Sequence, residues 1–351
     1  MIDCGGQKPH YLNQLTQWAK EHDVPLVTTL ELTPFCNFSC VMCYVRMTPE
    51  QAVKQGSLLT VDQWLDIAHQ AREMGTLYLT ITGGEPLMYP DFWKLYEKLN
   101  QMGFLITILS NGTLIDEAVM EKFQQFGLPH AVKLTLYGAS NETYLRTCCC
   151  PDGFSRISRA IELLHKAGVP VSMTATIVRE NSADLHQMHR FARQHGIVLQ
   201  HTTTVVQSSR GVQNSALTSR YSFDEFADEL TLEVLEKNKL PPLGSPFAWC
   251  ASYRSSLFIT WNGKLQLCSF LSDPSVSWSG NLHENWNELI MLGHALKSPA
   301  ECSDCQWSMF CQRCPGLLCS ESGHPEKISP NLCQTAENLY KLYHKRLSQE
   351  E

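Results

Sequence analysis

The chain has 351 residues with a formal net charge of −7, and 43% of them are hydrophobic, which is typical of a globular protein with a large core and two domains. A negative charge without a basic stripe argues against nucleic acid as a partner, and the lack of an 18-residue apolar run argues against a membrane span. No basic-then-apolar secretory signal occurs, so the fifteen cysteines favour metal or cluster ligation in a cytoplasmic protein over disulfides.

Strands and helices alternate along the first two thirds of the chain. The spacing of Leu12, Leu15 and Trp18 indicates a lead-in helix. Strands are predicted over 27–33, 77–82, 104–110, 131–137, 171–178 and 197–206, and helices over 60–74, 90–102, 115–126, 154–167, 183–195 and 223–237, with a polar connector over 47–57. This alternation favours an α/β fold with a parallel sheet, and six units fit a partial (β/α)6, TIM-like barrel whose ligands bind at the carboxyl ends of the strands.

The composition changes after a cluster of proline and glycine at 240–246, which we interpret as a domain boundary. The predicted organisation is a lead-in segment over 1–26, a barrel over 27–240 and a smaller α+β region with a C-terminal helix over 241–351. In that last region, apolar runs flank Asn262-Gly263, which predicts a hairpin. Eight of the fifteen cysteines lie between Cys250 and Cys333.

Three cysteines, Cys36, Cys40 and Cys43, follow the first predicted strand with the spacing CxxxCxxC. Three thiolates can hold three irons of a four-iron cluster and leave the fourth open for a ligand. The spacing resembles the signature of the radical S-adenosylmethionine (radical SAM) enzymes. The resemblance implies a [4Fe–4S] cluster whose open iron binds SAM, and a 5′-deoxyadenosyl radical formed when an electron cleaves the sulfonium. The alternative is a zinc site, although structural zinc needs four ligands and the loop offers three.

The same resemblance implies a set of SAM-contacting residues after the first three strands. They are Met42, Gly83, Gly84, Glu85, Pro86, Ser110 and Asn111. Glycines let the backbone approach a ligand, and Glu85 could accept from the SAM ammonium or cap the following helix. Ser110 and Asn111 match the family's contacts around the ribose and carboxylate, or form a capped turn. Met42 stands where the family mostly has an aromatic residue, and its thioether could pack on the adenine instead.

The C-terminal cysteines resemble the SPASM extension of radical SAM enzymes, which holds up to two auxiliary [4Fe–4S] clusters. The resemblance implies one cluster on Cys302, Cys305, Cys311 and Cys333, and another on Cys250, Cys268 and Cys314, with Cys319 as an open fourth member. Cys314 follows Cys311 by an unusual spacing, so the roles of Cys314 and Cys319 stay open. If one of them does not ligate, the cluster keeps an open iron for substrate. The alternative is a structural zinc site built from the two CxxC pairs.

Four further cysteines, Cys4, Cys148, Cys149 and Cys150, belong to neither pattern. A thiol in the run 148–150 could donate a hydrogen atom or contact substrate at the ligand side of the barrel. The alternative is packing, because cysteine is among the most frequently buried residues.

Together the resemblances imply an enzyme that matures a ribosomally made peptide by a thioether or carbon–carbon crosslink. Two related alternatives are a sulfatase-maturase-like side-chain dehydrogenase and a peptide epimerase. An alternative of another class is a non-catalytic iron–sulfur or zinc module. Expected partners are a peptide or protein substrate and an electron donor such as flavodoxin or ferredoxin. No N-terminal region is large enough to resemble the winged-helix reader of some relatives, so leader recognition, where it occurs, would come from a separate leader-peptide-binding protein or from the catalytic domain.

Overall fold

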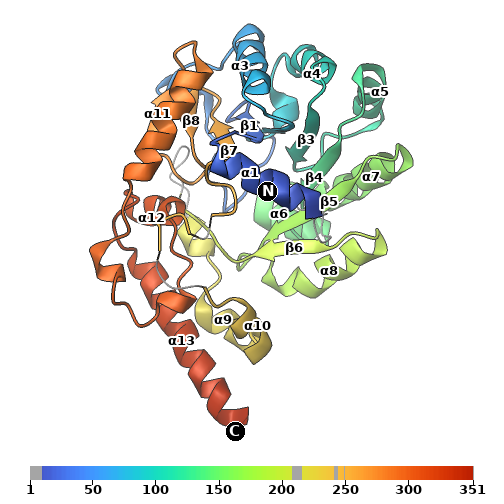
Figure 1. Cartoon of the computed structure of the whole chain (residues 1–351). Helices are drawn as coiled ribbons and strands as arrows, with labels where there is room; N and C mark the ends of the chain where they lie inside the picture. Colours follow the sequence, from blue (N-terminus) through green and yellow to red (C-terminus); the bar gives the residue numbers. More distant parts are fainter. Residues whose placement is uncertain (1–9, 208–215, 241–243, 249, 351) are drawn as a thin grey trace.

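A computed structural model of the chain describes residues 10–207, 216–240, 244–248 and 250–350 (Figure 1). Cys4 lies outside these described residues. None of the helices in the described part of the chain combines the length and apolar character that a membrane span requires.

Nine strands form one sheet in the order β6-β5-β4-β3-β2-β1-β7-β8-β9. The parallel strands are β1 (Val27–Glu31), β2 (Tyr78–Thr82), β3 (Leu105–Ser110), β4 (Ala131–Thr135), β5 (Val171–Thr176) and β6 (Leu199–Thr202), with β7 (Ser256–Ile259) parallel to β1. The strands β8 (Lys264–Gln266) and β9 (Ser275–Ser277) are antiparallel. The predicted α/β fold with six parallel strands and the predicted hairpin at Asn262-Gly263 are therefore confirmed.

The helices come between the strands and then dominate the C-terminal third. They are α1 (His10–Glu21), α2 (Pro49–Val53), α3 (Val61–Glu73), α4 (Phe92–Gln101), α5 (Glu117–Phe126), α6 (Asn141–Cys148), α7 (Gly153–Lys166), α8 (Leu185–Gln194), α9 (Phe223–Phe226), α10 (Leu232–Lys237), α11 (Leu282–Ala295), α12 (Pro315–Ser322) and α13 (Pro330–Glu350). Short 3₁₀ turns are η1 (Pro86–Met88), η2 (Ser182–Asp184), η3 (Ala216–Ser219), η4 (Ala227–Glu229), η5 (Ala300–Cys302) and η6 (Ser308–Phe310).

Three sequence predictions about helices were wrong. The predicted helix over 223–237 is broken, because Leu230 is extended and Thr231 caps a new helix by accepting a hydrogen bond from the Val234 N–H. The predicted connector over 47–57 contains α2, which begins with a capping box of Thr48 and Gln51. The helix α6 was missed, although Ser140 caps it by accepting from the Thr143 N–H.

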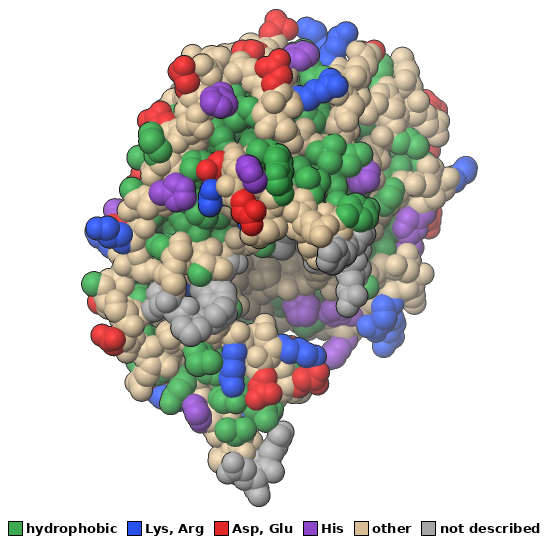
Figure 2. Space-filling view, in the orientation of Figure 1, with side chains coloured by type: hydrophobic (Ala, Val, Ile, Leu, Met, Phe, Trp, Pro, Cys, Tyr) green, Lys and Arg blue, Asp and Glu red, His purple; other side chains and the backbone are tan. Residues whose placement is uncertain are grey.

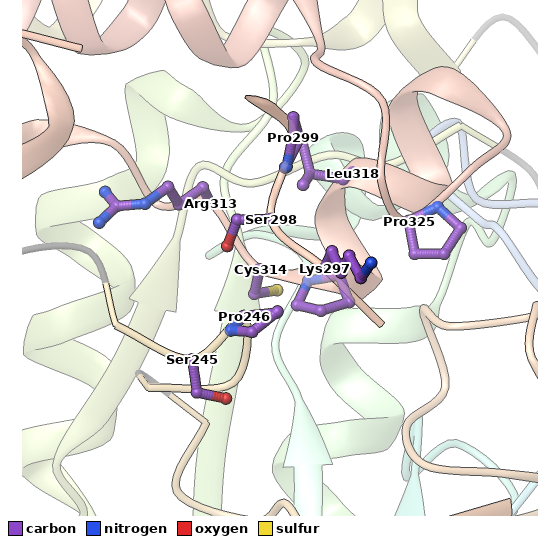
Figure 3. A pocket seen from close by; sticks show the side chains of 10 residues that line it. Ser245, Pro246, Lys297, Ser298, Pro299, Arg313, Cys314, Leu318 and Pro325 are labelled. Atoms are coloured by element: carbon purple, nitrogen blue, oxygen red, sulfur yellow. The ribbon is translucent and has the colours of Figure 1, made fainter. Parts of the chain in front are cut away.

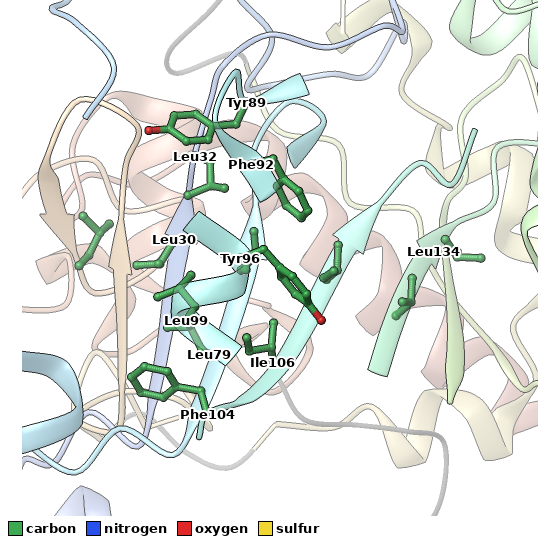
Figure 4. Packing of buried hydrophobic residues seen from close by; sticks show 14 of the residues in the cluster. Leu30, Leu32, Leu79, Tyr89, Phe92, Tyr96, Leu99, Phe104, Ile106 and Leu134 are labelled. Atoms are coloured by element: carbon green, nitrogen blue, oxygen red, sulfur yellow. The ribbon is translucent and has the colours of Figure 1, made fainter. Parts of the chain in front are cut away.

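The core lies on the side of the sheet that the helices cover. Aliphatic residues of β1, β2 and β3 such as Leu30, Leu79 and Ile106 are fully or nearly fully buried, and aromatic residues of α4 pack on them (Figure 4). Tyr96 of α4 is completely buried, and its hydroxyl donates a 2.8 Å hydrogen bond to the Gly127 carbonyl. Alternate residues of the strands therefore serve one continuous apolar layer.

The opposite face of the sheet, which we call the inner face, carries many polar residues in addition to Val27, Tyr78, Leu105, Leu109 and Ala131. Strand register places on this face Thr29, Glu31, Thr80, Thr82, Thr107, Lys133, Thr135, Ser172, Thr174, Thr176, Gln200 and Thr202. Barrel interiors are usually filled with branched apolar side chains. This inner face instead presents hydroxyl, amide and charged groups, which are suited to a polar ligand.

The sheet continues across the predicted domain boundary. β7 pairs with β1 in parallel register, with Leu30 opposite Ile259, so the cysteine-rich region extends the sheet of the barrel. The central part of the predicted boundary, 241–243, lies outside the described residues, and the division into two domains stays a prediction.

Candidate functional site

The loop with the CxxxCxxC spacing is anchored to the end of α6. The Ser39 N–H donates to the Cys148 carbonyl at 3.0 Å, and the Val41 N–H donates to the Thr147 carbonyl at 2.9 Å. Phe38 is buried in the same place, with its ring 5.6 Å from the ring of Tyr137. The loop is therefore held both by backbone hydrogen bonds and by aromatic packing.

The thiols of Cys36, Cys40 and Cys43, which we call the loop set, share one environment. Burial, together with the neighbouring charges of Glu85, Cys40 and Cys43, raises the pKa of Cys36 to about 12. Backbone N–H groups counteract this effect: Phe38 donates to the Cys36 thiol at 3.4 Å, and Arg46 donates to the Cys43 thiol at 3.3 Å. Three thiols on one loop, two of them with backbone N–H donors, are a donor set that fits an iron–sulfur cluster, whose binding would replace their protons.

The Gly-Gly-Glu-Pro turn supports the start of this loop. The Gly84 N–H donates to the Thr33 carbonyl at 2.6 Å, and the Glu85 N–H donates to the Phe35 carbonyl at 2.8 Å. A Cβ on Gly84 would lie 2.3 Å from the Phe35 oxygen, and one on Gly83 would lie 2.7 Å from the Thr33 oxygen. The close approach that requires these glycines is to the loop's own backbone.

Glu85 is completely buried and its carboxylate is surrounded by donors. It accepts from the Ser110 hydroxyl at 2.9 Å and 3.0 Å, from the Asn111 N–H at 3.0 Å and from the Leu87 N–H at 3.3 Å. Burial outweighs these hydrogen bonds and raises the pKa of Glu85 to about 7. Glu85 therefore caps the 3₁₀ turn η1, because its side chain accepts from the Leu87 N–H within that turn. This is one of the two roles that the sequence left open.

Asn111 joins the end of β3 to the cysteine loop. Its amide donates to the Asn37 side chain at 2.8 Å and faces the Cys36 thiol at 3.8 Å. The Asn37 amide donates to the Thr113 hydroxyl at 3.0 Å, and this hydroxyl donates back to Asn111 at 2.7 Å. Sequence reasoning missed Asn37 and Thr113. Their signals were the position of Asn37 inside the cysteine motif and the turn-forming run Ser110-Asn111-Gly112-Thr113.

Met42 is 8% exposed and packs in a small apolar cluster with Val178, Val205 and Ala216. This cluster includes residues that follow β5 and β6, so it adds an apolar wall beside the loop. A thioether in such a wall can pack against a planar ring.

The run Cys148-Cys149-Cys150 occupies three different environments. Cys148 is fully buried and is hydrogen-bonded to Cys40 in the loop set. Cys149 is exposed and ends α6 in the left-handed conformation with φ 58°. The Cys150 thiol donates to the Asp152 carboxylate at 3.4 Å. The helix end turns consecutive side chains in different directions, so the three thiols do not form one site.

Tyr137, directly beyond β4, is a site residue that the sequence did not indicate. Its side chain hydrogen-bonds the Cys40 thiol and lowers the pKa of that thiol, against the larger upward effects of Cys148 and burial. The phenol itself is buried among the thiols, and burial raises the pKa of Tyr137 well above its usual value.

The strand β6 places one histidine away from the inner face. His201 pairs with Ala175 on the helix side of the sheet, and its ring nitrogen lies 3.2 Å from that of His189 in α8. Thr202 lies on the inner face.

A second group of thiols, which we call the hairpin set, consists of Cys250, Cys268 and Cys314. Burial, together with the charges of Cys314 and Cys250, raises the pKa of Cys268 to about 12. The Phe270 N–H, which hydrogen-bonds the thiol, lowers this pKa in part. The Cys314 thiol accepts from the Leu317 N–H at 3.4 Å at the start of α12. Cys319 is buried within α12, and its thiol lies 3.5 Å from the Ser272 hydroxyl.

A third group, which we call the terminal set, consists of Cys302, Cys305, Cys311 and Cys333. Burial raises the pKa of Cys302, and the charges of Cys333 and Cys305 add to this rise. Burial raises the pKa of Cys311 to about 11. In the described ranges no three His, Cys, Asp or Glu side chains have the spacing of a single-ion site. Each thiolate of a four-iron cluster binds a different iron.

A small pocket is lined by Cys314 of the hairpin set (Figure 3). Pro246, Lys297 and Pro315 are among its lining residues. Elsewhere, Figure 2 shows one face of the molecule hollowed near its centre, with an interior formed mainly by uncharged polar groups and backbone.

Comparison with known proteins identifies the family. Residues 30–192 match the model of the Radical SAM superfamily. An AdoMet-dependent heme synthase of Methanosarcina barkeri is 29% identical, covering 54% of this chain and 53% of that protein. A PqqA peptide cyclase of Granulibacter bethesdensis is 28% identical, and the match covers 49% of this chain and 45% of that protein. The subtilosin biosynthesis protein AlbA of Bacillus subtilis is 22% identical, and the match covers 92% of this chain and 74% of that protein. The chain spans about half the length of the first two relatives.

Solved structures share the fold over nearly the whole chain. Streptococcus suis SuiB bound to its precursor peptide SuiA has a TM-score of 0.61 at 17% identity, covering 91% of this chain and 78% of SuiB. The protein anSMEcpe with bound AdoMet has a TM-score of 0.61 at 18% identity, and the match covers 93% of this chain and 99% of anSMEcpe. A [4Fe–4S] cluster and SAM are the cofactors that this family implies. Residues 30–192 of the chain therefore form a radical SAM domain.

Proposed function

We propose that the chain modifies a ribosomally made peptide, forming a thioether or carbon–carbon crosslink. Support comes from relatives whose names state peptide chemistry, namely the PqqA peptide cyclase and the subtilosin biosynthesis protein AlbA. The similarity to AlbA is the broadest of these, because it extends over 92% of the chain and includes the cysteine-rich region.

One structural observation carries this proposal. The loop set, the glycine turn and the Ser110–Asn111 turn meet at the carboxyl edge of the parallel sheet, next to the inner face. SAM and a peptide backbone both offer many hydrogen-bonding groups. The threonine hydroxyls of the inner face can satisfy such groups in a site from which bulk water is displaced.

The loop set would hold the [4Fe–4S] cluster, which when bound supplies the electron that cleaves SAM. The protein's own contribution is positional. Asn111 and Asn37 fix the loop relative to β3, Tyr137 donates toward Cys40, and Met42 adds an apolar wall. Glu85 is saturated by internal donors, so its main role is to hold the Ser110–Asn111 turn in place.

We assign the hairpin set and the terminal set to two auxiliary [4Fe–4S] clusters within a SPASM domain over 241–351. An electron donor such as flavodoxin or ferredoxin and a separate leader-peptide-binding protein complete the proposed system in the cytoplasm. The terminal set offers four thiols and suits a fully ligated cluster. The hairpin set offers three, which leaves one iron for Cys319 or for substrate.

The first experiment tests the cofactors. Anaerobically reconstituted protein is assayed for iron, sulfide and, after reduction with SAM, 5′-deoxyadenosine. We expect about twelve irons per chain if all three clusters form. Cys40→Ala should abolish 5′-deoxyadenosine, whereas Cys149→Ala, a cysteine from the exposed end of α6, should not. Zinc without 5′-deoxyadenosine would refute the proposal in favour of a non-catalytic metal module.

The second experiment tests the substrate. Small peptides encoded beside this gene are incubated with the enzyme and examined by mass spectrometry. A crosslink removes two hydrogens and ties two residues together in fragmentation. A side-chain dehydrogenase, the first alternative, removes two hydrogens from one residue. An epimerase leaves the mass unchanged but incorporates deuterium from heavy water. Turnover of a tetrapyrrole and of no peptide would contradict the proposed substrate class.

A further inference from the structure

A buried arginine stands in the sequence between a cysteine of the terminal set and a cysteine of the hairpin set. Arg313 is 6% exposed and stands in sequence between Cys311 and Cys314. A buried guanidinium is unfavourable unless anionic or hydrogen-bonding groups surround it. The adjacent pocket is lined by Lys297 and by proline, serine and leucine side chains in addition to Arg313 and Cys314.

The guanidinium is directed toward the terminal set. It donates to the Ser308 carbonyl, and the same carbonyl accepts from the Cys311 N–H at 3.3 Å. The Ser308 N–H in turn donates to the Cys305 carbonyl at 3.1 Å. Arg313 is thereby fastened to the loop that joins two members of the terminal set. In Figure 3 its side chain runs away from Cys314, which belongs to the hairpin set.

The charge of Arg313 acts on the terminal set. The guanidinium lowers the pKa of Cys302 and of Cys311, in each case against a larger rise caused by burial. The exposed Glu301 acts in the opposite direction, because its charge raises the pKa of Cys302 and Cys333. A buried cation and an exposed anion therefore face the same thiols, and the buried charge is less screened by water.

A cluster held by four thiolates is anionic, and reduction adds one more negative charge. Its reduction potential depends on net charge, on hydrogen bonds to sulfur and on exposure to solvent. A fixed positive charge in a site of low dielectric stabilises the reduced form more than the oxidised form.

We propose that Arg313 is a positioning residue that raises the reduction potential of the iron–sulfur cluster held by the terminal set. This inference rests on the proposed function, because it requires that the terminal set holds a cluster. It makes the terminal cluster the better electron acceptor of the two auxiliary clusters, since the guanidinium runs away from Cys314 of the hairpin set and hydrogen-bonds the loop of the terminal set.

The test is a redox titration of the reconstituted full-length protein, followed by electron paramagnetic resonance at stepped potentials. Cys333→Ala identifies the component that belongs to the terminal set. At the potential where this component is half reduced in the wild type, Arg313→Gln should lower the ratio of reduced to oxidised cluster about tenfold, which is 59 mV for one electron. Arg313→Lys, which keeps the charge, should have a ratio of reduced to oxidised cluster close to that of the wild type. Glu301→Gln, which removes a negative charge, should have a higher ratio than the wild type.

The matched control is Lys297→Gln, which removes an exposed cation from the rim of the same pocket and should leave all components unchanged. An Arg313→Gln protein with full iron content and wild-type potentials overturns the proposal. So does loss of the terminal cluster in both Arg313→Gln and Arg313→Lys, because it would show that the side chain only braces the loop. If Cys333→Ala removes neither iron nor any component, the terminal set holds no cluster, and the cluster assignment fails first.

Discussion

Replacing Gly84 with alanine tests whether the glycine turn exists to support the cysteine loop. The new Cβ would lie 2.3 Å from the Phe35 oxygen and 2.6 Å from its carbonyl carbon. An ordinary contact needs about 3.5 Å, so the Phe35 carbonyl must move by about 1 Å. This movement strains the chain by about 1–3 kcal/mol, and it weakens two hydrogen bonds worth about 0.5–1.5 kcal/mol each.

We therefore expect Gly84→Ala to lower the free energy of unfolding by about 2–5 kcal/mol. The measurement is the urea midpoint of the metal-free protein, together with the iron bound after reconstitution. Both should fall, because the displaced carbonyl belongs to the residue before Cys36. Gly244→Ala is the control, since its Cβ would meet only Ala248 at 3.9 Å. A Gly84→Ala protein with the midpoint and iron content of the wild type would refute this reasoning.

Three further predictions follow from single side chains. Burial raises the pKa of Glu85 from 4.5 to about 7, so between these pH values the folded chain retains a proton that the unfolded chain releases. The free energy of unfolding therefore falls as the pH rises from 4.5 to about 7. Glu85→Gln should flatten this dependence by about 3 kcal/mol, measured as urea midpoints against pH, and an unchanged slope would contradict the assignment. Cys149→Gly should stabilise the protein by up to about 1 kcal/mol, because glycine adopts the left-handed cap without strain; a lower melting temperature would count against it. After reconstitution, Cys314→Ser should bind about four irons fewer per chain than the wild type, whereas Cys319→Ser should bind as many as the wild type. Equal losses of iron in the two variants would show that Cys319 is also a ligand.

The sequence predicted the barrel strands because each carries a strong local signal. Parallel strands buried by helices are rich in Leu, Ile and Val at alternate positions, and here those positions face the helices. The helix ends at Thr60 and Ser140 illustrate both outcomes. The helix that follows the capping box at Thr60 is long and amphipathic and was predicted. The helix that follows Ser140 has only eight residues, ends at Cys148 and was not predicted.

The support of the site was harder to predict, because it depends on contacts between distant residues. Cys148 meets Cys40 across a separation in sequence of more than a hundred residues, and Tyr137 reaches the same thiol from β4. Neither pairing has a local pattern. The motif identified the three thiols, but only the fold shows that the cysteine run at the end of α6 packs against them.

The relation between the loop set and the hairpin set follows from the sheet. β1 delivers the cysteine loop, and its neighbour β7 continues through β8 to Cys268, with Leu30 and Ile259 paired in register. Tyr44, next to Cys43, contacts Phe270, two residues beyond Cys268, with ring centroids 5.2 Å apart. Hydrogen bonds along a sheet allow far less relative movement than a loop connection does. The spacing between the two thiol sets is therefore fixed by strand pairing and this aromatic contact. A change in the segment 244–248 that joins the regions should leave that spacing intact.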